Sequence, residues 1–139
     1  MADTKAIDTK AFNPEGWDWQ DRYSINQALE VQGGQRVIYC SGQASVDAQS
    51  QPMHAGDFVK QVNQAFDNLE AVLKSAGLSL ANVVRLNHYT TDLAAWYQAV
   101  PVFRARLDAA GCKPTGTLLV VAGLFHPDLM FEMEATAVA

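Results

Sequence analysis

Hydrophobic and polar residues alternate most regularly in the stretch 129–138. Residues 129, 131, 133, 135 and 137 are apolar, and the residues between them include Glu132 and Glu134. Strict alternation is typical of a strand with one face in the core and one face turned outward. The preceding run, 118–122, is apolar at every position, as in a strand that is covered on both faces. Together the two runs predict a β-hairpin over 117–138.

The clearest helical pattern covers 57–76, where apolar residues recur at spacings of three and four. Gly77 follows directly and is a typical helix end. A second apolar stripe follows Asp92, which can cap a helix, but Pro101 interrupts this stripe. Because proline lacks a backbone donor yet is tolerated in a first turn, we expect a short turn and then a main helix that begins near Pro101.

Three further strands are predicted at 23–31, 36–41 and 83–91. The resulting order is strand, strand, helix, strand, helix, strand, strand. It predicts an α/β (α+β) fold with a mixed β-sheet and two helices packed on one face. Residues 1–139 are expected to form one domain, in which 1–12, polar and without periodicity, is a flexible N-terminal tail.

Two helices can cover only one face of a sheet of five or six strands. The runs 36–41 and 118–122 are nevertheless apolar on both faces. An exposed apolar area of that size is unusual for a soluble monomer. We therefore expect other copies of the chain to cover the second face, in a homo-oligomer whose sheets face one another.

Composition narrows the classes of partner. The 139 residues carry a formal net charge of −5, and no run of Lys or Arg exceeds one residue, which disfavours a nucleic-acid partner. No apolar run approaches the roughly 20 residues that a membrane span needs, so no membrane partner is expected. The two cysteines are too few for a disulfide framework, and the first ten residues lack the apolar core of a signal peptide. A cytoplasmic protein is expected.

The histidines and cysteines do not suggest a metal site. No two of the three histidines are spaced as metal ligands, and no CxxC motif is present, so neither a metal nor a cofactor is expected. His88 alternates with Leu86 and Thr90, which favours a satisfied core histidine over a catalytic one. Cys40 is interpreted as a buried packing residue, and Cys112, just after a helix end, is expected to be exposed.

Three stretches resemble one known family. The runs YCSGQASVD, VNQAFDNLEAVLKSAGLSLANVVRLNHYTTDL and FEMEATAVA are similar to the RidA/YjgF family, also called the L-PSP endoribonuclease family. The similarity extends from about Tyr23 to the C-terminus. It implies a chorismate-mutase-like fold, a homotrimer, and clefts between subunits that bind small carboxylate-bearing molecules. It also implies hydrolysis of reactive enamines and imines released by pyridoxal-phosphate enzymes, the activity of the best-studied members.

The chain departs from the family at the position that binds the substrate carboxylate. Active members carry Pro-x-Arg-Ser/Thr before the first strand of the final pair, whereas this chain reads PTGT, with Gly116 in place of the arginine. A guanidinium binds a carboxylate bidentately, and a glycine cannot replace it. The family's asparagine on the second helix is also missing, and its cysteine is Leu118. Whether Arg104 or Arg106 supplies the positive charge stays open.

The family positions that remain define a candidate site. By the resemblance, Glu134 orients or activates the attacking water, and in an apolar interface its pKa would rise towards the range useful for acid–base catalysis. The alternative is that Glu132 and Glu134 make interface contacts only, which is the preferred interpretation for Glu132. Small residues and strand-end hydroxyls can shape a pocket, which a glycine at 116 would enlarge. The candidate ligand-binding residues are Tyr23, Ser41, Gly42, His88, Gly116 and Thr117.

Two functions remain open at this point. The first is a RidA-like homotrimer that binds a small molecule at its subunit interfaces and hydrolyses or tautomerises an enamine or imine through Glu134 and a bound water. The second is a non-catalytic small-molecule-binding or regulatory trimer that lost the clamp. Endoribonuclease activity, which the older family name suggests, is disfavoured by the acidic balance of charges.

Overall fold

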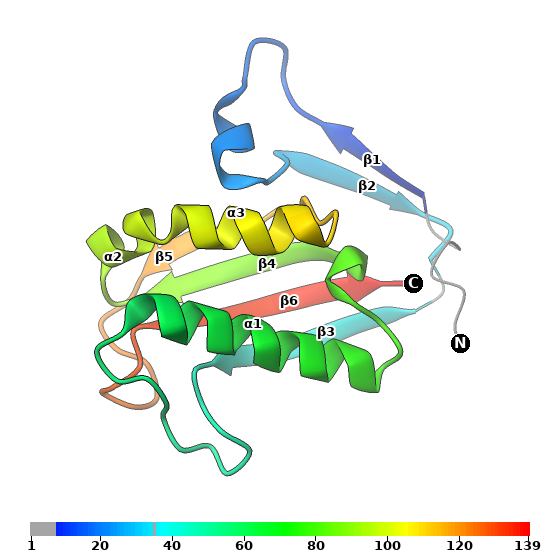
Figure 1. The fold of residues 1–139 in the computed structure, drawn as a ribbon. Helices are drawn as coiled ribbons and strands as arrows, with labels where there is room; N and C mark the ends of the chain where they lie inside the picture. Colours follow the sequence, from blue (N-terminus) through cyan, green and yellow to red (C-terminus); the bar gives the residue numbers. More distant parts are fainter. Residues whose placement is uncertain (1–7, 35) are drawn as a thin grey trace.

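The computed structural model describes residues 8–34 and 36–139. In this part of the chain, helices cover one face of a four-stranded sheet, and a two-stranded ribbon stands apart from it (Figure 1). The mixed α+β architecture is as predicted, although the strands divide into two sheets rather than one. In chain order the elements are β1 (Asp8–Phe12), the 3-10 helix η1 (Trp19–Tyr23), β2 (Ala28–Gln32), β3 (Val37–Ala44), α1 (Phe58–Ser75), the 3-10 helix η2 (Leu80–Asn82), β4 (Val83–Thr90), α2 (Leu93–Gln98), α3 (Val100–Ala109), β5 (Leu118–Val120) and β6 (Phe131–Val138).

Helix α1 confirms its predicted range to within one residue at each end. It begins after Asp57, whose carboxylate accepts a hydrogen bond from the Lys60 backbone N–H at 3.0 Å. It is followed by Gly77, which adopts a left-handed φ of +76°. Glycine adopts this helix-ending conformation without steric strain because it has no Cβ. The apolar side of the helix is buried against the sheet and α3, as its periodicity requires, through Phe58, Val62, Ala65, Phe66, Leu69 and Leu73.

The predicted break in the second helical region is confirmed. Helix α2 begins after Asp92, whose side chain accepts from the Ala95 N–H at 3.0 Å, and α3 carries Pro101 in its first turn. Both helices lie beside α1 on the same face of the sheet (Figure 1). None of the described helices has the length and apolar content needed to cross a membrane.

The order of the four strands, β3–β6–β4–β5, overturns the predicted C-terminal hairpin. Strand β5 pairs in parallel with β4, while β6 runs antiparallel between β3 and β4. Residues 121–130 between β5 and β6 are long enough to carry the chain past β4, so the two last strands need not be neighbours. Alternation shows which face a residue occupies, and it does not show which strand lies beside it.

Residues 8–12 form a strand where the sequence predicted a flexible tail. Strand β1 pairs antiparallel with β2, and all its side chains are exposed, so its hydrophobic pattern carries no signal. Residues 1–7 of the predicted tail lie outside the described residues. The strand predicted at 23–31 is also shorter, because Tyr23 belongs to η1 and β2 begins at Ala28.

The helices leave the second face of the four-stranded sheet open, as predicted. Val37, Tyr39 and Leu119 are 51%, 82% and 50% exposed. Pairing of β4 with β6 places polar residues on the same face. This open face is therefore mixed in character, with an apolar side at β3 and a polar middle formed by Arg85, Asn87, Tyr89, Glu132, Glu134 and Thr136.

Candidate functional site

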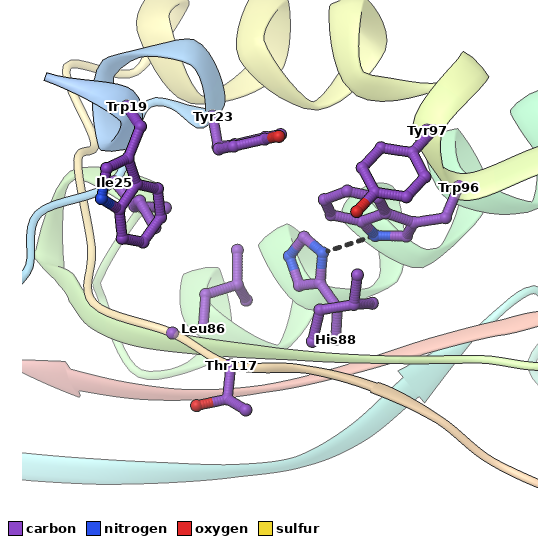
Figure 2. A pocket seen from close by; sticks show the side chains of 10 residues that line it. Trp19, Tyr23, Ile25, Leu86, His88, Trp96, Tyr97 and Thr117 are labelled. Carbon is purple, nitrogen blue, oxygen red and sulfur yellow. Dashed lines mark hydrogen bonds between the residues drawn. The ribbon is translucent and has the colours of Figure 1, made fainter. Parts of the chain in front are cut away.

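A pocket of about 350 Å³ opens at the edge of the sheet, between α2, η1 and the segment that leads into β5 (Figure 2). We call it the aromatic pocket. None of the described residues that line it is Lys, Arg, Asp or Glu. It brings together four of the six predicted ligand-binding residues. Its walls are Trp19, Tyr23, Ile25, Leu86, His88, Trp96, Tyr97, Gly116, Thr117 and Leu118.

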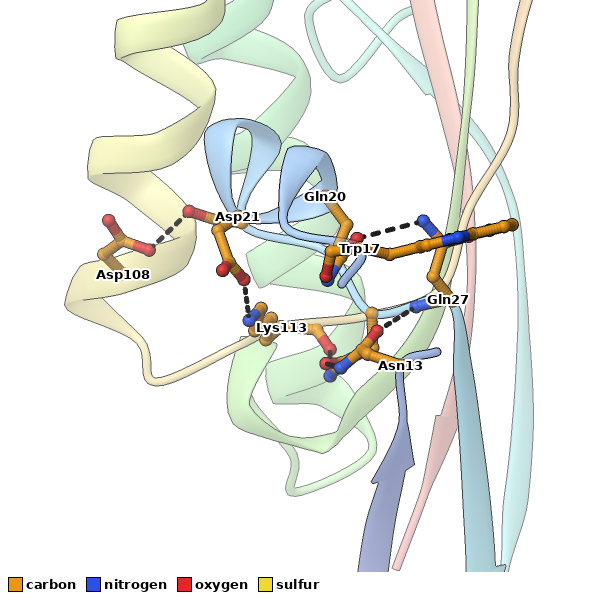
Figure 3. A network of polar contacts seen from close by, with 9 residues as sticks. Asn13, Trp17, Gln20, Asp21, Gln27, Asp108 and Lys113 are labelled. Atoms are coloured by element: carbon orange, nitrogen blue, oxygen red, sulfur yellow. Dashed lines mark hydrogen bonds and ion pairs between the residues drawn. The ribbon is translucent and has the colours of Figure 1, made fainter. Parts of the chain in front are cut away.

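A polar network holds η1 in the place where its aromatic residues can face the pocket (Figure 3). The Ser24 hydroxyl donates to the Asp108 carboxylate on α3 at 2.6 Å, and the Lys113 ammonium pairs with Asp21 at 2.6 Å. Each link joins parts of the chain that are more than eighty residues apart. The network thereby fixes a short 3-10 segment that has few hydrogen bonds of its own.

His88 sits on β4 at the floor of the pocket. The indole N–H of Trp96 donates to its Nδ1 at 3.1 Å (Figure 2). An indole can only donate, so Nδ1 is the acceptor and the neutral ring carries its hydrogen on Nε2. The ring also packs against Phe103 and Phe131, with centroids 4.9 and 5.3 Å away. Burial lowers the pKa of His88 to about 4, so the ring is neutral at physiological pH.

The lowered pKa of His88 predicts a loss of stability in acid. Because its folded pKa of about 4 lies below the ordinary value of 6.5, the unfolded chain binds the proton more readily. The contribution of His88 is complete above pH 6.5 and declines as the pH falls towards 4. We expect the titration of His88 to lower the unfolding free energy by about 2 to 3 kcal/mol as the pH falls from 6.5 to about 4.

Urea unfolding at a series of pH values measures this loss. The carboxylates titrate in the same range, so the informative quantity is the difference between the wild type and His88→Phe, which lacks the titrating ring. His126→Phe, which removes a histidine outside the aromatic pocket, is the matched control for loss of an imidazole. Identical pH slopes for the wild type and His88→Phe would contradict the assignment.

Glu134, the predicted catalytic residue, lies on the opposite side of the sheet from the aromatic pocket. Neighbouring residues of a strand point to opposite faces, so Asn87 lies on the open face while Leu86 and His88 line the pocket. Glu134 and Asn87 line a second hollow of about 300 Å³, the polar groove, together with Tyr39, Cys40, Arg85, Ala135 and Thr136. The Glu134 carboxylate accepts hydrogen bonds there from the Tyr89 hydroxyl and, at 3.3 Å, from the Asn87 amide.

The pKa values of the two carboxylates on the open face move in opposite directions. Hydrogen bonds, first from Tyr89 and then from Asn87, lower the pKa of Glu134. Burial, followed by the charge of Glu134, raises the pKa of Glu132. The predicted rise for Glu134 is therefore wrong for a single protomer, because hydrogen bonds to the charged form outweigh its burial. Hydrogen bonds thus favour the charged carboxylate form of Glu134, whereas the pKa of Glu132 moves towards the range of a general acid.

Ser41 and Gly42 do not reach the aromatic pocket, because β6 lies between their strand and β4. They occupy the irregularity where the pairing of β3 with β6 shifts between Cys40 and Gln43. A Cβ at Gly42 would come closer than 3.0 Å to the Glu132 carboxylate. The glycine therefore makes room for Glu132 and does not form part of the pocket wall.

Gly116 is needed for the close approach of two backbone segments. A Cβ at this position would come closer than 3.0 Å to the Leu86 carbonyl oxygen. On either side, the Thr115 carbonyl accepts from the Leu86 N–H and the Thr117 carbonyl accepts from the His88 N–H, each at 2.8 Å. The expectation that this glycine enlarges the pocket is thus corrected. Its missing side chain lets the segment pair with β4, and an arginine does not fit this backbone.

No arginine of the described chain lines the aromatic pocket. Arg106 pairs with Asp67 at 2.9 Å and with Glu70 at 2.8 Å on the outer side of the helices. Arg104 is not among the residues that line the pocket, and Arg85 lines the polar groove on the other face. The aromatic pocket of one protomer is therefore uncharged.

Neither cysteine is suited to act as a nucleophile. Cys40 is buried, as predicted, and Cys112 is buried too, which corrects the expectation that it is exposed. Cys112 packs in the core beneath α3, and burial raises its pKa to about 12. A thiol that stays protonated at neutral pH is a poor nucleophile.

The sequence analysis missed most of the aromatic walls. Trp96 falls in the apolar stripe that follows Asp92, and Trp19 lies just ahead of the first predicted strand. Helical periodicity shows that a side chain faces inward, and it cannot show that a cavity lies there. The only signal was the concentration of aromatic residues just before the first predicted strand and in the short turn before Pro101.

Comparison with known proteins gives consistent matches. The family model described as Endoribonuclease L-PSP matches residues 21–139. Protein DfrA of Myxococcus xanthus is 35% identical over 114 residues, which are 82% of this chain and 84% of that protein. The 2-iminobutanoate/2-iminopropanoate deaminase of Mus musculus is 31% identical and covers 81% of this chain and 79% of its own. The solved structure of YyfB from Yersinia pestis, of the conserved Rid protein family, is 28% identical, with a TM-score of 0.80 over 94% of this chain and 98% of that one.

Proposed function

This chain belongs to the endoribonuclease L-PSP family, the RidA/YjgF family, and from that premise we propose that it binds a small, uncharged metabolite. The observation that carries the proposal is the lining of the aromatic pocket, which contains no charged side chain among the described residues. A carboxylate in such a pocket would lose its hydration without gaining a cation. The backbone at Gly116 leaves no room for the arginine that would supply one.

We propose that residues 1–139 form one RidA-like domain and that three copies assemble as a homotrimer through the open face of the sheet. The exposed apolar side chains of Val37 and Tyr39 at one edge of this face, and of Leu119 at the other edge, support this assembly, because another copy of the chain would remove them from water. In such a trimer, the ligand would lie where the pocket at the sheet edge meets a neighbouring subunit.

The reaction we propose for the bound molecule is hydrolysis or tautomerisation of an imine or enamine, with Glu134 orienting a water. The name of the mouse relative, an imine deaminase, supports this class of chemistry. Glu134 is held as a carboxylate, which is the form that accepts a proton from an attacking water. Asn87 links it to the pocket edge, since its Oδ1 accepts from the Thr117 N–H at 3.2 Å.

A second candidate function, binding without catalysis, is favoured by the separation of Glu134 from the aromatic pocket. In one protomer, Glu134 and the aromatic pocket lie on opposite faces of the sheet, and the two hollows share no lining residue. In that case the chain retains the family scaffold as a small-molecule-binding or regulatory protein.

Replacing Glu134 by Gln separates the two functions. If the chain is an enzyme, the wild type should release ammonia from an uncharged aryl imine faster than from 2-aminoacrylate, and Glu134→Gln should lower that rate about 100-fold. Glu132→Gln is the matched control and should change the rate less.

Each alternative outcome has a distinct meaning. Thermal stabilisation by uncharged aromatic compounds without turnover of either imine would support the binding function. A preference for 2-aminoacrylate would contradict the uncharged ligand. Light scattering on Glu134→Gln shows whether the substitution acts by dissociating the trimer.

A further inference from the structure

His88 presents one hydrogen-bond donor to the aromatic pocket. Its Nδ1 is occupied by Trp96, and the hydrogen on Nε2 has no acceptor among the described residues. Figure 2 shows this second ring nitrogen on the side away from Trp96, towards the space between Tyr23 and Leu86. The ring is surrounded by aromatic side chains, but this edge remains open to the pocket.

From this arrangement we infer that the pocket takes an aromatic molecule that carries a carbonyl or imine group, which accepts a hydrogen bond from His88 Nε2–H. The inference rests on the proposed function, because it specifies the class of the uncharged ligand. Aromatic ligands suit this pocket because Trp19, Tyr23 and Trp96 border it, and aromatic pairs gain from offset and edge-to-face contacts. The acceptor fixes the orientation of the ligand.

The contact with Trp96 makes His88 a donor only. If the ring carried its hydrogen on Nδ1 instead, two N–H groups would face each other across 3.1 Å. The ring therefore cannot switch to its other tautomer for a ligand that offers only donors at this place. Such a ligand leaves the Nε2–H group without an acceptor, which weakens its binding. The hydroxyls of Tyr23 and Tyr97 can both donate and accept, so they add no comparable selection.

The substrate and the product of the proposed reaction both carry a hydrogen-bond acceptor at the same position. In hydrolysis of an imine, water adds to the carbon of the C=N bond, ammonia leaves with the nitrogen, and a C=O bond takes its place. The imine nitrogen and the product oxygen each have a lone pair at the same position of the ligand. His88 can therefore bind substrate and product in one orientation, as a positioning contact rather than a proton carrier.

The test compares two uncharged molecules of the same shape with a third that carries a charge. Acetophenone carries the carbonyl, α-methylstyrene carries a CH₂ group in its place, and benzoate adds a charge. We expect the wild type to bind acetophenone about three- to tenfold more tightly than α-methylstyrene, and benzoate more weakly than either. In His88→Phe, the ratio should fall to about one while binding of α-methylstyrene is kept. His126→Phe is the matched control and should keep the wild-type ratio.

A second measurement does not depend on the folding of His88→Phe. Long-range ¹H–¹⁵N spectra of the wild type should show His88 with its hydrogen on Nε2, and Trp96→Phe should weaken this preference and lower the ratio. Equal affinity of the wild type for acetophenone and α-methylstyrene, or a hydrogen on Nδ1, overturns the role of His88 and leaves the uncharged pocket standing. Tighter binding of benzoate, or no binding of any probe, overturns the proposed function as well.

Discussion

Gly116→Ala is expected to lose at least about 3 kcal/mol of unfolding free energy. The added methyl group would overlap the carbonyl oxygen of Leu86, and that atom belongs to a strand paired on both sides. Relief therefore requires the segment around position 116 to move away from β4. That movement breaks backbone hydrogen bonds at Leu86 and His88.

Urea unfolding of three glycine variants measures this effect. Gly123→Ala is the matched control, because a Cβ at Gly123 meets nothing within 4 Å. Gly42→Ala should lie between the two, because there the clash is with the end of the Glu132 side chain, which can rotate. A Gly116→Ala protein as stable as Gly123→Ala would show that the segment is free to shift. The proposed lack of room for a side chain at position 116 would then be wrong.

If the chain forms the proposed homotrimer, Tyr39→Asp is expected to convert it into monomers. Tyr39 is 82% exposed on the open face of the sheet and is the most exposed large apolar residue among those described. If three copies close over this face, an aspartate at position 39 is buried without a partner, and its desolvation opposes assembly. Loss of a large aromatic anchor adds to the effect.

Size-exclusion chromatography with light scattering tests both the assembly and the variant. The wild type should have a mass of about 45 kDa, three times 15.1 kDa, and Tyr39→Asp about one third of that. Val59→Asp, on the exposed side of α1, places the same charge on the helical layer and should remain trimeric. A wild type that is monodisperse at the monomer mass at micromolar concentration would refute the assembly.

The parts of the fold that depend on local chemistry could be predicted from the sequence. Helix α1 follows from its apolar period and from Asp57 and Gly77 at its ends, and the break before α3 follows from Pro101. The C-terminal hairpin was wrong because the choice of neighbour depends on long-range packing. Strand β6 buries Phe131 and alternate residues after it in the centre of the sheet, and only a central place covers them fully.

The candidate site could be predicted only in part. Tyr23, His88 and Thr117 do meet in one pocket, whereas Ser41 lies beyond β6 and Glu134 on the other face. The place of Ser41 depends on strand order, which the sequence pattern does not contain. The place of Glu134 follows from the alternation of faces along paired strands. The lowered pKa of Glu134 in one protomer could not be predicted from the sequence, because its hydrogen-bond donors come from β4, a strand more than forty residues away.

The parallel pairing of β5 with β4 has a consequence for how the chain folds. It encloses α2 and α3 in one crossover, and the pocket walls come from four separated parts of the chain, around residues 19–25, 86–88, 96–97 and 116–118. The aromatic pocket is complete only when all four parts have taken their places, and local unfolding of any one of them removes it. The capacity to hold a ligand is therefore a property of the fully folded chain.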